Sequence, residues 1–265
     1  MISELTQLAI KAAIKASKDV LTIYESEDFE IEIKKDNSPL TKADKVAHKI
    51  IHSVLQESKI PILSEEGKNI PYETRKNWHR LWIIDPIDGT KEFIKRNGEF
   101  TINIALVEKG TPIIGVIIAP ALGLIYFSEK NTGSFKSMVN FDFFKLEDLL
   151  SKAKSLPIYN KFETFTVIVS RSHLSQETEA YVENIKVKHG KINFIPIGSS
   201  LKLCLVAEGK GNCYPRFSPT MEWDTAAGHA ICKFAGCELT DLETKQEMIY
   251  NRKELTNNWF ILKQC

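Results

Sequence analysis

The sequence predicts a layered α/β protein with two lobes, and three patterns along the chain support this prediction. Residues 3–25 place apolar side chains at helical intervals, which is typical of a helix docked on a core. The apolar runs in the middle of the chain are joined by short turns such as EKGTP, which favours an antiparallel sheet. After about residue 145, helical and strand-like patterns alternate. We therefore expect an α+β first lobe at residues 1–140 and a smaller α/β second lobe at residues 141–265.

The individual elements follow from the same periodicities. Helical spacing predicts helices at residues 3–25, 43–57, 145–153, 175–186, 199–208 and 224–235. Alternating or continuously apolar runs predict strands at residues 29–34, 60–64, 80–85, 100–107, 112–119, 122–127, 165–169, 191–195, 211–214 and 258–262. The lobe boundary is placed near residue 140 because the segment KNTGSFKSMVNFDF follows neither period.

Composition and charge exclude several classes of protein. Hydrophobic residues make up 43% of the 265 residues and charged residues 26%, which is typical of a globular protein with a substantial core. A net charge of +1 supplies no strong field for nucleic acid or an anionic membrane. The apolar stretch TPIIGVIIAPALGLIYF is interrupted by proline and glycine, so a transmembrane segment is not expected. Five cysteines without a CxxC pair, and no export signal, predict reduced thiols, a cytoplasmic location and no zinc site.

The segment WIIDPIDGTKEF contains two aspartates where one would be enough for a turn. Pro86 favours an extended Asp85 at the end of the strand LWII. Asp88 stands before Gly-Thr in the position of a helix N-cap, and a helix that begins there would direct the amides of Gly89 and Thr90 toward a phosphate. A DPxDG turn followed by a cap would explain the same residues without any function.

Three other segments carry acids in comparable positions. Glu65 follows the apolar run of ILSEEGK, Asp224 precedes the small residues of PTMEWDTAAGHAI, and Asp44 forms a T-x-x-D pair with Thr41. Each has a purely structural explanation, as a loop tip, an N-cap or a capping pair. If these carboxylates converge with Asp85 in one cleft, each pair about 4 Å apart costs roughly 4 kcal/mol at an effective dielectric constant of 20. A divalent cation would offset this repulsion, and an all-oxygen set favours Mg²⁺.

The motifs also resemble those of a known family. WIIDPIDGT together with EWDTAAGHAI resembles the inositol monophosphatase superfamily of Mg²⁺-dependent, lithium-sensitive phosphatases. The segments DGTKEFIKRNGEFTINIALV and GSSLKLCLVAEGKGNCYPRFSPTMEWDTAAGHAI are similar to the bacterial CysQ family of 3'(2'),5'-bisphosphate nucleotidases. The resemblance extends from the Thr41 loop to Gly236 and implies the layered αβαβα sugar-phosphatase fold. Residues 130–165 and the C-terminal tail match no motif.

The resemblance implies a role for each acid. One Mg²⁺ would be held by Glu65, Asp85 and the carbonyl oxygen of Ile87, and a second by Asp85, Asp88 and Asp224, so that each active site holds two or more ions. Asp44 and Thr90 would position and deprotonate the attacking water. The residues implied to bind substrate near the ions are Glu65, Ile87, Asp88, Gly89, Thr90 and Asp224.

The resemblance further implies the substrate. This is adenosine 3',5'-bisphosphate, which would be cut to AMP and phosphate by direct in-line attack of water, with 3'-phosphoadenylyl sulfate as a second substrate and sulfur assimilation as the context. Candidate contacts to the rest of the nucleotide are Ser170, His173, Ser199, Ser200, Lys202 and Arg216. The serines could instead cap helices, and the charged residues could be solvated surface groups. His229 is expected to pack, and Glu222 to be a charge at the rim.

Several alternatives stay open at this point. An inositol monophosphatase or a fructose-1,6-bisphosphatase would have the same fold, and a non-catalytic metal-dependent nucleotide sensor would belong to another class. The sequence predicts a small-molecule partner rather than nucleic acid. It leaves open a homodimer and, by the family resemblance, a peripheral position on the cytoplasmic face of the inner membrane.

Overall fold

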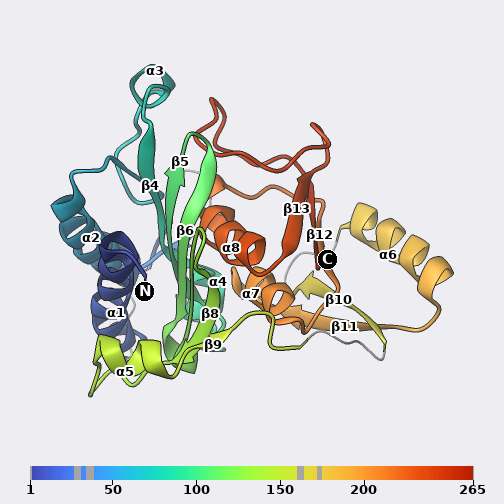
Figure 1. Ribbon diagram of the computed structural model, residues 1–265, viewed down its shortest axis with the longest axis horizontal. Coiled ribbons are helices and arrows are strands. Elements are labelled where there is room, and N and C mark those ends of the chain that lie inside the picture. The colour runs from blue at the N-terminus through green and yellow to red at the C-terminus, as the bar shows by residue number, and fades with distance from the viewer. Residues whose placement is uncertain (1, 27–30, 34–38, 160–163, 172–174, 265) are drawn as a thin grey trace.

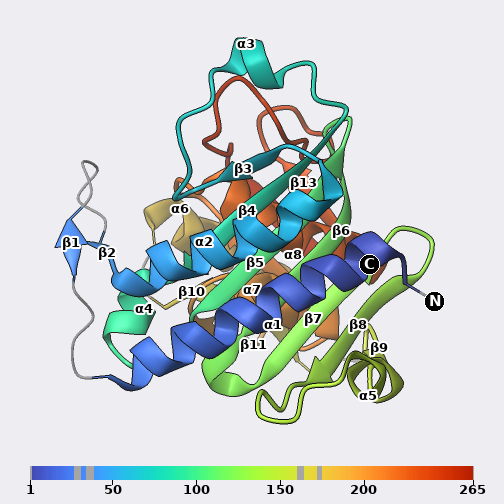
Figure 2. The same ribbon diagram turned by 90° about the vertical axis from the view of Figure 1, so that its left-hand side faces the viewer.

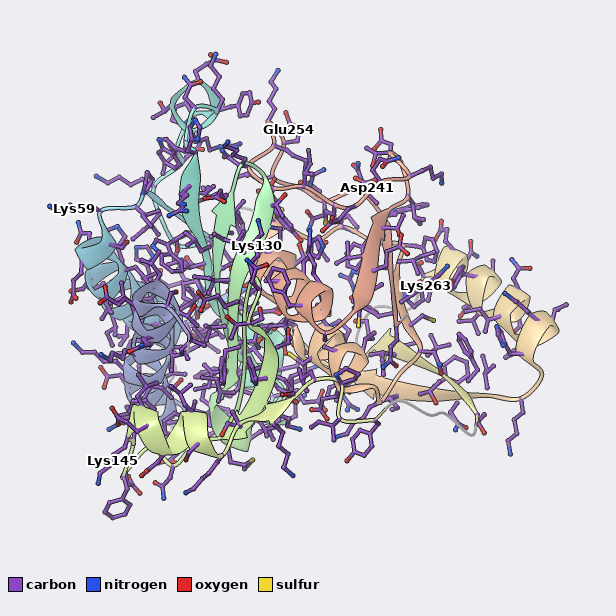
Figure 3. The ribbon with its side chains drawn as sticks, in the orientation of Figure 1. Lys59, Lys130, Lys145, Asp241, Glu254 and Lys263 are labelled. Carbon is purple, nitrogen blue, oxygen red and sulfur yellow. The ribbon has the colours of Figure 1, made fainter. Side chains whose placement is uncertain are left out.

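The computed structural model describes residues 2–26, 31–33, 39–159, 164–171 and 175–264. Two larger sheets and the helices packed on them form five layers, with the order helix, sheet, helix, sheet, helix (Figure 1). The αβαβα prediction is therefore confirmed. Side chains fill the space between the layers (Figure 3).

The first sheet has seven strands and occupies the N-terminal part of the chain. In spatial order its strands are β3 (Ile62–Ser64), β4 (Arg80–Asp88), β5 (Thr101–Glu108), β6 (Thr111–Ala119), β7 (Leu124–Glu129), β8 (Gly133–Met138) and β9 (Lys154–Ser155). All neighbouring pairs are antiparallel, as expected, except β3 and β4, which run parallel. A separate pair consists of β1 (Glu32–Ile33) and β2 (Pro39–Leu40).

The second sheet has five strands and belongs to the C-terminal part. Its spatial order is β11 (Ile192–Ile197), β10 (Phe165–Ser170), β12 (Cys213–Arg216), β14 (Phe260–Gln264) and β13 (Cys237–Asp241). Strand β10 runs parallel to both of its neighbours, whereas the other pairs are antiparallel. The division into lobes near residue 140 stays a prediction. Strand β9, after that point, pairs with β8 of the first sheet.

The helices cover the two sheets and fill the space between them. They are α1 (Glu4–Glu25), α2 (Lys42–Leu55), α3 (Tyr72–Arg75), α4 (Thr90–Ile94), α5 (Leu146–Ser151), α6 (Gln176–His189), α7 (Leu201–Glu208) and α8 (Glu222–Phe234), with 3₁₀ turns η1 (Gln56–Ser58) and η2 (Pro120–Leu122). Helices α1 and α2 lie side by side on one face of the first sheet (Figure 2). Helix α8 packs on its other face and also on β13, and α7 packs on α8 and the second sheet. Helix α6 covers the outer face of the second sheet (Figure 1).

The apolar alternation of the first sheet divides the core into two parts. Trp82 and Ile84 of β4 point toward α1 and α2, whereas Leu81 and Ile83 point toward α7 and α8. Helix α8 approaches the sheet so closely that a Cβ atom on Gly115 would lie 2.3 Å from the Ala227 carbonyl oxygen. The small residues after Asp224 therefore serve the close approach of α8 to the first sheet.

Three expectations about helix ends are wrong. Strand β4 continues through Asp88, and the N-cap of α4 is Gly89, whose φ of 89° is a left-handed conformation that glycine adopts without strain. Helix α8 begins at Glu222, so Asp224 lies inside its first turn rather than at the cap. The N-cap of α7 is Ser200 rather than Ser199. The elements α3, β8, β9 and β13 were not predicted.

Among the described residues, no helix is both long and apolar enough to cross a membrane. The cysteines that the structure describes are all free and buried, as expected for reduced thiols, and they are Cys204, Cys213, Cys232 and Cys237.

Candidate active site

A bulge in β4 brings two aspartates to the same face of the first sheet. Asp85 pairs with Asn103 of β5 and Asp88 pairs with Thr101, so three steps along β4 match two steps along β5. In a regular strand, residues three apart point to opposite faces. The extra residue is absorbed by the bulge, which turns Ile87 into the core under α1 and α2 and directs Asp88 to the side of Asp85.

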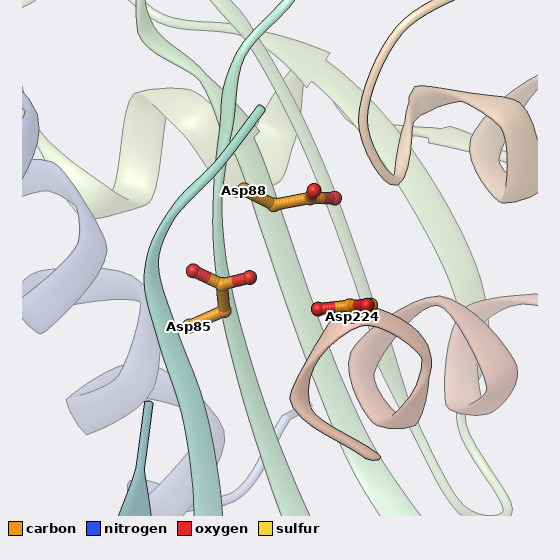
Figure 4. Close-up of side chains that lie close together, drawn as sticks. All are labelled: Asp85, Asp88 and Asp224. Carbon is orange, nitrogen blue, oxygen red and sulfur yellow. The ribbon is translucent and has the colours of Figure 1, made fainter. Parts of the chain in front are cut away.

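The third aspartate comes from the C-terminal part of the chain. Asp224 lies in the first turn of α8, and its Oδ2 atom accepts a hydrogen bond from the Met221 amide at 2.8 Å. One carboxylate oxygen from each of Asp85, Asp88 and Asp224 lies within 4.8 Å of the other two. Figure 4 shows the three side chains converging from β4 and α8. We call these three residues the aspartate cluster.

Burial and mutual repulsion raise the pKa values of the three carboxyl groups in the aspartate cluster. Burial, followed by repulsion from Glu65, Asp88 and Asp224, raises the pKa of Asp85 well above its usual value. Burial also raises the pKa of Asp224 to about 8, with further repulsion from Asp88. Burial raises the pKa of Asp88 to about 6, although the nearby Lys202 ammonium acts in the opposite direction. At neutral pH the cluster therefore retains protons, which a cation would have to displace.

Glu65 reaches the same place from the neighbouring strand. It directly follows β3, whose Ser64 pairs with Ile84 of β4, and its amide donates to the Ile84 carbonyl at 3.2 Å. The parallel pairing places the ends of β3 and β4 at one edge of the sheet. Glu65 lines the cleft that contains Asp88 and Asp224.

Asp44 forms the predicted capping pair with Thr41 and also contacts Thr90. As a capping residue, its Oδ2 accepts hydrogen bonds from the Thr41 amide at 2.8 Å and the Thr41 hydroxyl at 2.5 Å. Its other oxygen, Oδ1, accepts a weaker bond from the Thr90 hydroxyl at 3.4 Å. The Thr90 hydroxyl is also 3.4 Å from the Ile87 carbonyl oxygen, so these three residues meet beside the cluster.

A cleft of about 300 Å³ opens beside the aspartate cluster. It brings together most of the predicted site residues, and its lining is Pro39, Glu65, Asp88, Gly89, Thr90, Lys91, Glu92, Ser170, Gly198, Ser199, Lys202, Arg216 and Asp224. Lys202 is buried, its Nζ donates to the Ser199 carbonyl at 2.5 Å, and burial lowers its pKa to about 8. Lys202 and Arg216 therefore bring positive charge to a lining that also contains the acids, and both also line a smaller pocket with Asp88 and Asp224.

The remaining predicted residues have different outcomes. Ser200 does not line this cleft but hydrogen-bonds to Thr101 and Asn103 of β5. His173 and Ser172 lie outside the described residues. His229 packs as expected, with Nδ1 3.0 Å from the Tyr250 hydroxyl and Nε2 3.1 Å from Glu247.

The expectation that Glu222 is a rim charge is wrong. It is fully buried, and its carboxylate accepts hydrogen bonds from the amides of Asn251 at 2.7 Å and Arg252 at 2.9 Å. These bonds attach the first turn of α8, which carries Asp224, to the loop before β14. The sequence analysis missed this role because the partner amides lie about thirty residues away.

Asn103 is a polar residue of the site that the sequence analysis did not select. It interrupts the apolar strand TINIALV, and a polar side chain in such a run was the available signal. Lys91 and Glu92 also line the cleft, although the sequence had marked them only as features of a subfamily.

Comparisons with known proteins agree with this geometry. The model of the inositol monophosphatase family matches residues 1–264. The 3'(2'),5'-bisphosphate nucleotidase CysQ of Salmonella typhimurium is 38% identical over 263 residues, covering 98% of each chain. The CysQ of Buchnera aphidicola is 40% identical over 239 residues, covering 89% of this chain and 82% of its own.

Solved structures give the same result. The crystal structure of CysQ from Bacteroides thetaiotaomicron, a bacterial member of the inositol monophosphatase family, has a TM-score of 0.89 and 48% identity, covering 98% of this chain and 96% of its own. An IMPase of Thermotoga maritima has a TM-score of 0.73 and 25% identity, covering 97% of this chain and 91% of its own. The resemblance noted in the sequence is thus confirmed, and this chain belongs to the inositol monophosphatase family.

Proposed function

We propose that this protein is a Mg²⁺-dependent phosphatase that removes the 3'-phosphate of adenosine 3',5'-bisphosphate to give AMP and phosphate. The proposal depends above all on one observation, the buried Asp85 and the partly buried Asp88 and Asp224, whose carboxylate oxygens meet within 4.8 Å at the edge of a cleft with cationic residues. The relatives named 3'(2'),5'-bisphosphate nucleotidase, which match nearly the whole chain, support the choice of substrate. We infer that 3'-phosphoadenylyl sulfate is a second substrate.

The residues present fit a magnesium site. The cluster offers only carboxylate oxygens, which are the ligands that Mg²⁺ prefers, and burial leaves these carboxylates without enough positive charge nearby. Asp85, Glu65 and the Ile87 carbonyl would hold one ion, and Asp85, Asp88 and Asp224 a second. When bound, such ions make water more acidic and neutralise phosphoryl oxygens.

The other groups at the cleft would guide the proton and the substrate. The Thr90 hydroxyl donates to the buried Asp44 carboxylate and would relay a proton to it from the attacking water. The amides of Gly89 and Thr90 border the cleft and would donate to the phosphate that is cleaved.

The cationic residues of the cleft would bind the second phosphate of the nucleotide. Lys202 and Arg216 supply the charge, while Ser170 and Ser199 supply hydroxyl groups on the same lining. An inositol monophosphate has no second phosphate for these groups, so this part of the lining favours a bisphosphate substrate.

Phosphate release from adenosine 3',5'-bisphosphate, with and without Mg²⁺, is the direct test. We expect Asp85→Asn to reduce kcat/KM by more than the roughly 100-fold that is typical when a group merely supporting a metal ligand is lost. The matched control is Asp241→Asn, a buried aspartate at the end of β13 (Figure 3), which should keep wild-type activity.

Other outcomes of the assay would point to the alternatives. Faster turnover of inositol 1-phosphate or fructose 1,6-bisphosphate would reassign the substrate within the family. Tight nucleotide binding without phosphate release would indicate a sensor. Equal activity of wild type and Asp85→Asn would contradict the metal assignment.

The proposal extends to the setting of the enzyme. We propose a cytoplasmic location, where a nucleotide substrate would be available. Homodimer assembly and a peripheral membrane position stay predictions, which light scattering of the purified protein and fractionation of cells would test.

A further inference from the structure

Three buried polar side chains form a hydrogen-bonded chain next to Asp88. Thr101 and Asn103 lie on β5, on the face toward α7, and Ser200 is the N-cap of α7. The Ser200 hydroxyl lies 2.8 Å from the Thr101 hydroxyl and donates to Asn103 Oδ1 at 2.7 Å. This chain connects the first sheet to the second lobe at the level of the aspartate cluster.

The hydrogen bond from Ser200 fixes which way the Asn103 amide faces. Because Oδ1 accepts from Ser200, the Nδ2 group is directed to the opposite side. Among the described residues this buried Nδ2 has no hydrogen-bond partner. The pairing of Asn103 with Asp85, and of the neighbouring Thr101 with Asp88, places the group beside the aspartate cluster. The reverse orientation would place the amide oxygen against a carboxylate, and the two would repel each other.

We propose that Asn103 is a positioning residue whose NH₂ group holds the Asp88 carboxylate in the orientation that binds a divalent cation, and that Thr101 and Ser200 hold Asn103 in turn. This inference rests on the proposed metal site. Hydrogen bonds that hold a ligating group in place commonly contribute 10–100-fold to metal affinity.

Lys202 explains why a neutral donor is needed here. Its side chain is buried and lines the same cleft as Asp88. A carboxylate free to rotate would move toward Lys202, and the resulting ion pair would compete with the cation. The Asn103 amide restrains the carboxylate without neutralising it, and this leaves the negative charge available to the cation.

The test is the binding of Mg²⁺ by titration calorimetry and of Mn²⁺ by electron paramagnetic resonance, both without nucleotide. Asn103→Leu removes the donor at similar volume and should weaken binding of both ions about 10-fold. Thr101→Val should weaken it by about 3-fold, whereas Thr101→Ser, which keeps the hydroxyl, should bind as wild type does. The matched control is Ser134→Ala, since this buried hydroxyl also links two layers, donating to the Ile231 carbonyl at 2.6 Å, but lies outside the cleft.

Kinetics give a second measurement that general loosening would not reproduce. In Asn103→Leu the Mg²⁺ concentration for half-maximal activity should rise about 10-fold, while kcat at saturating Mg²⁺ and KM for the nucleotide stay near wild type. Wild-type affinity in Asn103→Leu, or an equal loss in Ser134→Ala, would overturn the role of Asn103. Failure of the wild-type protein to bind either ion would instead refute the proposed function itself.

Discussion

Helix α7 has buried carboxylates at each of its ends, and they differ in how their charge is balanced. At its N-terminal end lies the aspartate cluster, in which burial and mutual repulsion raise the pKa values of Asp85, Asp88 and Asp224. At its C-terminal end lies Glu208, also fully buried. Glu208 accepts hydrogen bonds from Tyr126 and from Lys136, and pairs with Lys210 at 3.0 Å.

The difference separates a structural carboxylate from a ligand. Burial alone would raise the pKa of Glu208, but its bonds to Lys136, Tyr126 and Lys210 outweigh burial and hold the pKa below its usual value. Glu208 therefore needs nothing from outside the chain. In the aspartate cluster, Lys202 and Arg216 act against burial and mutual repulsion but do not outweigh them, and this excess of negative charge indicates a place for an external cation.

The largest expected effect comes from removing one member of the cluster. Asp224→Asn should reduce kcat/KM by more than about 100-fold and abolish the stabilisation by Mg²⁺, which in wild type should reach about 2.7 kcal/mol at a concentration 100 times the dissociation constant. The measurement is thermal unfolding with and without Mg²⁺, beside the phosphate-release assay. An undiminished Mg²⁺ shift in Asp224→Asn would place the ion elsewhere.

The pH dependence of stability should have opposite signs at the two ends of α7. The folded-state pKa values of Asp88 (about 6) and Asp224 (about 8) exceed the ordinary value of 3.8, so the folded state binds more protons than the unfolded state between pH 4 and pH 8. Without metal, the free energy of unfolding should therefore fall by about 3 kcal/mol or more as pH rises through this range.

Glu208 contributes in the other direction. Its folded-state pKa is lowered, so its stabilisation is present above the unfolded value and is lost as pH falls through the folded value. Urea unfolding from pH 3 to pH 9 in EDTA would reveal both trends. Stability that rises steadily up to pH 8 in wild type would contradict the raised pKa values of the cluster.

The smallest effect on activity should come from changing Glu208, at the C-terminal end of α7. Glu208→Gln should lower the free energy of unfolding by about 2 kcal/mol, because it weakens hydrogen bonds to a charged group, and should leave kcat/KM within about twofold of wild type. Its control is Lys210→Ala, which removes a half-exposed partner and should cost less than about 1 kcal/mol. A loss of Mg²⁺ binding in Glu208→Gln would show that the two ends are coupled rather than separate.

Elements with a clear period of their own could be predicted from the sequence. Helix α1 and strands β5 and β6 lie where the periodicity placed them. Each is buried on one or both faces, and the apolar residues of these faces recur at regular intervals along the sequence. Strands β8 and β13 were missed because they are short and partly exposed, so the apolar alternation is weak. Strand β9, with two residues, is too short to show any period.

The candidate site was predictable in its residue types but not in its local geometry. Each acid stands beside an apolar segment, where a loop or helix end is expected, and this much follows from spacing. The assignments of Asp88 and Asp224 as N-caps failed because the bulge and the left-handed Gly89 extend β4, and because α8 begins two residues earlier than its period suggested. A bulge depends on the partner strand, which spacing within one segment does not reveal.

The sequence by itself determined the mixed α/β class and the family, and it predicted the set of candidate acidic residues, since each depends on order along the chain. Only the tertiary structure decided that Asp85 and Asp88 share a face, that Asp224 reaches them from α8, and that burial and mutual repulsion raise the pKa values of the cluster. It also joined Asn103 to Ser200, 97 residues later. Such contacts form when segments distant in the sequence pack together. The pKa values follow from the resulting burial, which the local sequence does not reveal.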